Sequence, residues 1–85
     1  MPETPNAIRQ ILADNMRRLR TEKDWSQEDL ARETNIHHNQ ISAIERCKHS
    51  VGIDTIERLA RAFGVKVGAL LDEQEPLKQM STSLK

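Results

Sequence analysis

The chain has 85 residues, enough for one small domain with a modest core and too few for a second folded module. Hydrophobic residues make up 36% of it and aromatic residues 2%, which favours a helical core over a β-sandwich. The formal net charge is zero, so the basic balance typical of nucleic-acid binders is missing, and such a function has to rest on where the charges lie.

Cysteine content and hydropathy indicate the cellular compartment of the protein. One cysteine excludes an internal disulfide, and no apolar run resembles a signal peptide or a membrane span. We therefore expect a cytoplasmic protein without membrane attachment.

The first predicted helix begins near Thr4, a possible N-cap, with Pro5 at the first helical position, and runs to about Glu22. Residues 1–6 are expected to form a short lead-in to the domain. Apolar residues recur in this helix at spacings of three and four and form one stripe: Ile8, Ile11, Leu12, Met16 and Leu19.

A capping box predicts the start of the second helix. Ser26 is followed three residues later by Asp29, so a helix is expected over 27–34. Asn35 tolerates left-handed geometry and is expected to turn the chain into a third helix, over about 38–46.

The remaining elements are a fourth amphipathic helix over 53–63, stopped by Gly64, and a short helix over 67–71. Residues 72–85 lose this periodicity and are expected to form a flexible tail. The predicted domain therefore spans residues 7–71.

All three histidines and the cysteine lie in the stretch NIHHNQISAIERCKHS, residues 35–50. If the third helix forms, His37 and Cys47 lie at its two ends, about 15 Å apart, too far to share a tetrahedral metal. A thiol at a helix C-terminus also meets a dipole that disfavours the thiolate. We therefore expect no metal, no cofactor and no enzymatic activity.

A helical projection of the predicted third helix separates an apolar inward side from a polar outward side. Ile41 and Ile44 point inward, and the outward side carries short residues: His38, Asn39, Ser42 and Ala43. A helix, a tight turn and a second helix with a polar outer face are typical of a helix-turn-helix whose second helix enters the DNA major groove. The alternative is that these residues are merely tolerated on a solvated surface.

Three segments of the chain, one of them within residues 35–50, resemble one known family. SQEDLA at 26–31, ISAIE at 41–45 and LARAFGVKVGALL at 59–71 are similar to the Cro/repressor type of helix-turn-helix, found in phage repressors and xenobiotic-response-element regulators. The resemblance covers about residues 12–71.

This resemblance implies an all-α, five-helix, lambda-repressor-like domain that binds operator DNA as a homodimer. The implied base-reading residues are His38, Asn39, Ser42 and Ala43. The implied phosphate-contacting residues are Gln27, His37, Arg46 and Lys48, and Arg20 and Glu45 match a structural ion pair.

The chain departs from the family pattern at two turns. Asn35 and Cys47 stand where family members usually have glycine. Asn35 is a mild change, whereas Cys47 is either strained in a left-handed conformation or the helix ends differently. His37 also stands where Ser or Thr would cap the helix better, and the paired histidines predict a DNA affinity that depends on pH.

The biological role stays open at this point. A phage-type repressor, the controller of a restriction–modification system and an antitoxin with a toxin partner all fit, as does an interaction module that does not bind DNA. The candidate dimer surface is equally open: Val65, Val67, Leu70 and Leu71 also fit a monomer core, and Ile8 at the N-terminus is another candidate.

Overall fold

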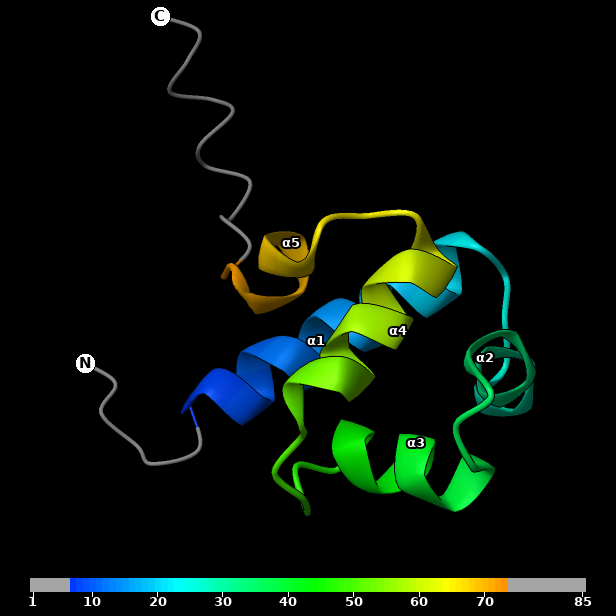
Figure 1. Cartoon of the computed structure of the whole chain (residues 1–85), viewed down its shortest axis with the longest axis horizontal. Coiled ribbons are helices and arrows are strands. Elements are labelled where there is room, and N and C mark those ends of the chain that lie inside the picture. The colour runs from blue at the N-terminus through cyan, green and yellow to red at the C-terminus, as the bar shows by residue number, and fades with distance from the viewer. Residues whose placement is uncertain (1–6, 74–85) are drawn as a thin grey trace, which may run out of the picture.

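A computed structural model of the chain describes residues 7–73, which form helices only, in an all-α arrangement (Figure 1). The predicted start at Thr4 and Pro5, the lead-in and the tail beyond Glu73 lie outside these residues. The predicted five-helix class is confirmed, and α3 ends one residue earlier than expected. The helices are α1 (Ala7–Glu22), α2 (Gln27–Thr34), α3 (His38–Glu45), α4 (Ile53–Phe63) and α5 (Val67–Leu71).

One hydrophobic core joins all five helices. α1 packs against α3 and α5, α2 packs against α3 and α4, and α4 also contacts α5. From the α1 stripe, Leu12, Met16 and Leu19 are buried, whereas Ile8 is 51% exposed. The other buried members of this core are Leu30, Ile36, Ile41, Ile44, Leu59, Ala60, Phe63 and Leu70.

The helices α1 to α4 all end in the same way. Each is followed by a residue with a left-handed backbone: Asp24 (φ 62°), Asn35 (φ 61°), Cys47 (φ 60°) and Gly64 (φ 75°). The next amide then donates to the carbonyl five residues earlier, as in Schellman-type helix ends. These bonds are Trp25 to Arg20 (2.9 Å), Ile36 to Ala31 (3.3 Å), Lys48 to Ala43 (2.9 Å) and Val65 to Ala60 (3.0 Å).

Cys47 therefore occupies the left-handed position that closes the third helix. The sequence allowed either a strained left-handed Cys47 or a different helix end, and the structure has the left-handed Cys47. This conformation is strained because a Cβ at positive φ approaches the carbonyl oxygen. Asn35 also has the left-handed geometry predicted for it, and its short polar side chain tolerates that geometry.

Side chains close the N-terminal ends of α2 and α3. The predicted capping box of α2 is present: Asp29 N–H donates to Ser26 Oγ (3.0 Å), and Ser26 N–H donates to Asp29 Oδ2 (2.9 Å). The hydrogen bond from the Ser26 amide lowers the pKa of Asp29. α3 is capped by a histidine, since Nδ1 of His37 accepts from the amide of Asn39 at 3.0 Å.

A buried amide side chain fastens the short helix α5 to α1. Asn15, which is 1% exposed, donates through Nδ2 to the carbonyls of Leu70 (2.7 Å) and Asp72 (2.9 Å). A five-residue helix is too short to be stable alone. These bonds satisfy carbonyls that the end of such a helix leaves without partners.

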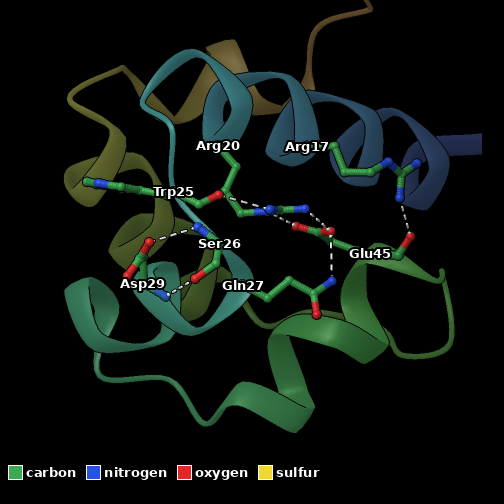
Figure 2. A network of polar contacts seen from close by, with 7 residues as sticks. All are labelled: Arg17, Arg20, Trp25, Ser26, Gln27, Asp29 and Glu45. Carbon is green, nitrogen blue, oxygen red and sulfur yellow. Dashed lines mark hydrogen bonds and ion pairs between the residues drawn. The ribbon is translucent and has the colours of Figure 1, made fainter.

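A buried ion pair fixes α3 against α1 (Figure 2). Arg20 and Glu45, expected to pair, meet through two contacts: Nε to Oε2 at 2.9 Å and Nη2 to Oε1 at 3.0 Å. Gln27 Nε2 donates to the same Oε1 at 3.1 Å. The side chain of Glu45 is only 3% exposed and that of Arg20 is 17% exposed, so the charges are largely out of water.

Two further arginine bonds extend this network along α1. Arg17 donates to the main-chain carbonyl of Glu45 at 2.6 Å, close to the C-terminal end of α3, where the helix dipole favours a cation. Arg20 also donates to the carbonyl of Trp25 at 3.0 Å, in the connection between α1 and α2. The network therefore joins the first three helices.

We predict that Cys47→Gly stabilises the protein. A left-handed residue with a Cβ costs about 1–2 kcal/mol, and glycine loses about 0.5–1 kcal/mol more backbone entropy on folding. The free energy of unfolding should rise by about 0.5–1 kcal/mol, measured by denaturant titration with Trp25 fluorescence. Asn35→Gly is the matched control and should change little, since Asn tolerates this geometry. A loss of stability in Cys47→Gly would contradict the strain assignment.

We predict that Arg20→Ala lowers the free energy of unfolding by about 3–5 kcal/mol, because it leaves the Glu45 carboxylate buried without its ion-pair partner. The double variant R20M/E45L should lose less, since it removes both charges. Arg61→Ala, in an exposed pair with Glu57, is the control and should cost about 0–1 kcal/mol. Equal losses in Arg20→Ala and Arg61→Ala would show that the burial of Glu45 has no energetic consequence.

Candidate nucleic-acid interface

The outer side of α3 carries the exposed polar residues of the predicted interface. Asn39 is exposed, and His38 and Ser42 are half-buried. Ile41 and Ile44 are buried on the opposite, inward side, as projected. Gln40 is also exposed, but it was not among the residues predicted to contact DNA. Its position directly after Asn39, on a helix with a polar outer side, could have identified it from the sequence.

Ala43 does not belong to this exposed surface. The projection placed it outward, but it is 7% exposed, so this prediction is wrong. The Lys48 amide bonds to the Ala43 carbonyl, and residues 49–50 line a shallow hollow with Asn39 and Gln40 close to this side of the helix.

His37 has a defined orientation at the N-terminal end of α3. Its Nδ1 accepts from the Asn39 amide, so in the neutral ring the hydrogen is on Nε2. The side chain is exposed, and Nε2–H is a donor suited to an anionic oxygen. Its position at the start of the helix allows a phosphate contact. The ring also caps the helix, a role for which Ser or Thr was expected to be better suited.

The other predicted phosphate-contacting residues surround α3. Arg46 and Lys48 are exposed just past its C-terminal end, and Nη1 of Arg46 donates to Ser42 Oγ at 2.5 Å. Gln27 lies beside α3 at the start of α2, with Nε2 directed to Glu45. An amide nitrogen carries two hydrogens, so this bond to Glu45 leaves one for another acceptor.

Residues 7–73 show neither a metal-binding group nor a membrane-spanning helix. No group of three or more His, Cys, Asp or Glu side chains in this range is arranged to hold a metal ion. None of its helices is long and apolar enough to cross a membrane. The Cys47 thiol is half-buried, and its Sγ donates to Oε1 of Gln10 at 3.5 Å.

Known sequences similar to this chain include helix-turn-helix proteins and transcription regulators. A family model described as Helix-turn-helix (HTH_3) matches residues 16–70. A hypothetical transcription factor of Neisseria meningitidis serogroup B is 43% identical over 77 residues, which cover 89% of this chain and 73% of that protein. The control protein C.BamHI of Bacillus amyloliquefaciens is 41% identical over 68 residues, which cover 79% of this chain and 84% of that protein.

A solved structure agrees with both sequence comparisons. The crystal structure of the hypothetical transcription factor NHTF from Neisseria superposes with a TM-score of 0.78 at 36% identity, covering 100% of this chain and 95% of that one. The superposition covers the part of this chain in which α2, the left-handed Asn35 and α3 form the helix-turn-helix. The chain therefore belongs to the HTH_3 family, the Cro/repressor or xenobiotic-response-element type of DNA-binding transcription regulators.

Proposed function

We propose that this chain represses transcription by binding a two-fold symmetric operator as a homodimer, with α3 of each subunit in the major groove. The observation that carries this proposal is the exposed polar edge of α3 on a helix that the buried Arg20–Glu45 pair holds in place. A helix that reads base edges needs such a fixed orientation, because each hydrogen bond depends on geometry. The bound dimer would then block access of the polymerase to the promoter.

Individual residues have chemically suitable roles in this proposal. Asn39 and Gln40 carry amide groups, which can bond adenine N6 and N7 together. His37, Arg46 and Lys48 would contact backbone phosphates and so set the register of α3. Gln27 would add a phosphate contact from α2 through its second amide hydrogen.

A homodimer explains the apolar surface that the monomer leaves uncovered. Ile8, Ile53 and Val67 are 51%, 76% and 36% exposed. Ile8 lines a groove together with Val51, Ile56 and Leu71, and a second copy of the chain would cover it. Leu70, considered for the interface from sequence, is buried in the monomer core and is no longer a candidate.

The names of the two sequence relatives, a transcription factor and a control protein, support a regulatory role. The second candidate is an interaction module of antitoxin type that binds a protein in place of DNA. It is favoured by the zero net charge and by the exposed carboxylates of Glu28 and Glu33 on α2. Recovery of a preferred duplex from random DNA separates the two candidates, and a palindrome would also reveal the two-fold symmetry.

We predict that Asn39→Ala and Arg46→Ala affect that duplex differently. Loss of Asn39 should reduce discrimination at one base-pair position by about 1–3 kcal/mol. Loss of Arg46 should weaken binding to all sequences and reduce the slope of log affinity against log salt by about 1. Both are measured by titration of the selected duplex and of scrambled duplexes at several salt concentrations.

The control for these variants is Arg61→Ala, which removes one positive charge from the α4 surface, away from the proposed interface. It should leave both the sequence preference and the salt slope close to those of the unmodified protein. If neither Asn39→Ala nor Arg46→Ala changes DNA retention beyond this control, binding through α3 is excluded.

A further inference from the structure

A side chain of α1 completes the C-terminal end of α3. The last four carbonyls of an α-helix find no partner within the helix itself. Main-chain amides of residues 46–48, here called the exit of α3, bond to the carbonyls of Ser42, Ala43 and Ile44 at 2.9–3.2 Å. The carbonyl of Glu45 instead accepts from Nη1 of Arg17, at 2.6 Å (Figure 2). Arg17 thus satisfies the carbonyl that the main chain of the exit leaves over.

A second contact joins α1 to the exit of α3. Sγ of Cys47 donates to Oε1 of Gln10 at 3.5 Å. Gln10 and Arg17 are themselves held together, because Nε2 of Gln10 and Nη2 of Arg17 both donate to Oδ1 of Asp14 at 2.9 Å. Side chains of α1 therefore bond to the residues on both sides of Arg46.

The exit of α3 carries two of the proposed phosphate-contacting residues, Arg46 and Lys48, and both are exposed. Phosphate contacts set the register of a protein on the duplex, so the main chain that presents them has to be in a defined place. A segment that is ordered before binding loses less conformational freedom on binding than one that becomes ordered in the complex. The bonds from α1 therefore bear on how strongly these two side chains can contact DNA.

The neighbouring Arg18 makes its contacts on another side of α1. Its Nη1 bonds to Oε2 of Glu22 and its Nη2 to Oδ1 of Asn15, both at 3.3 Å. The side chains of Arg17 and Arg18 are 42% and 38% exposed. The two arginines thus have the same charge and a similar exposure, but Arg17 is the one of the two that bonds to α3.

We propose that Arg17 is a positioning residue for DNA binding: it holds the exit of α3 against α1, so that Arg46 and Lys48 meet the phosphates from a fixed main chain. This inference rests on the proposed function and adds a residue of α1 to it. Phosphates carry no sequence information, so Arg17 sets the affinity for every duplex and leaves the preference between sequences unchanged.

The first test uses the free protein. Hydrogen exchange of the amides of residues 46–48 is measured in the unmodified protein, in Arg17→Ala and in Arg18→Ala. These amides should exchange about 3-fold faster or more in Arg17→Ala, because the end of α3 has lost a hydrogen bond. Arg18→Ala, which removes the same charge from the same helix, should leave their exchange unchanged. Thermal unfolding of each variant verifies that it is folded.

The second test measures affinity for the selected operator and for scrambled duplexes, at a salt concentration low enough for every variant to bind. Arg17→Ala should bind all duplexes about 3- to 10-fold more weakly than Arg18→Ala, with an unchanged ratio of selected to scrambled. Arg17→Lys keeps a donor for the Glu45 carbonyl and should recover part of the loss. In an R46A/K48A background, Arg17→Ala and Arg18→Ala should bind equally, because Arg17 acts through the two side chains that are missing.

Three results would overturn the inference. The first is equal hydrogen exchange of the exit in Arg17→Ala and Arg18→Ala, and the second is equal affinity of these two variants for the selected operator. The third is a loss in Arg17→Ala that persists in the R46A/K48A background, which would mean that Arg17 contacts a phosphate itself. Each of these removes this inference alone, whereas an unmodified protein that selects no duplex removes the proposed function as well.

Discussion

The orientation of α3 depends on one buried carboxylate. α3 has eight residues, and its large apolar anchors are Ile41 and Ile44, a narrow stripe that leaves rotation about the helix axis weakly defined. Glu45 receives two hydrogen bonds from Arg20 and one from Gln27. Burying these charges brings little net stability compared with apolar packing. What the network adds is direction, since a bidentate pair is satisfied in only one relative placement of α1 and α3.

The tight connections between helices impose a second constraint. Residues 7–73 contain five helices, and four of them end in a left-handed residue followed by an amide that bonds back to the last turn. This closure turns the chain within one or two residues and so keeps a small core covered. Glycine adopts such a backbone without a steric cost, but Gly64 is the one glycine among these four positions. Asn and Asp tolerate this backbone better than other non-glycine residues. Of the four helix ends, the one at Cys47 therefore has the greatest backbone strain.

Much of this fold followed from local chemistry in the sequence. The capping box at Ser26, the left-handed turn at Asn35 and the stop at Gly64 are each encoded by residue types with a strong local preference. The roles of Asn15 and Arg17 did not follow, because their partners are main-chain carbonyls 28 to 57 residues away, and any sequence supplies carbonyls. Ala43 was misplaced because a helical projection shows the direction of a side chain but not how far its surroundings cover it.

The hydrogen bonds within α3 also divide its polar groups into those already used and those left for a partner. Nδ1 of His37 is used by the N-cap, Ser42 Oγ accepts from Arg46, and the Glu45 carboxylate is buried. These bonds fix the donors that remain, Nε2 of His37 and the rest of the Arg46 guanidinium, at the two ends of the helix. The donors at the two ends, with the exposed amides of Asn39 and Gln40 in the first turn between them, match a duplex, which presents anionic phosphates on either side of its base edges. Internal bonding thus gives α3 a pattern suited to DNA although the chain as a whole has no net charge.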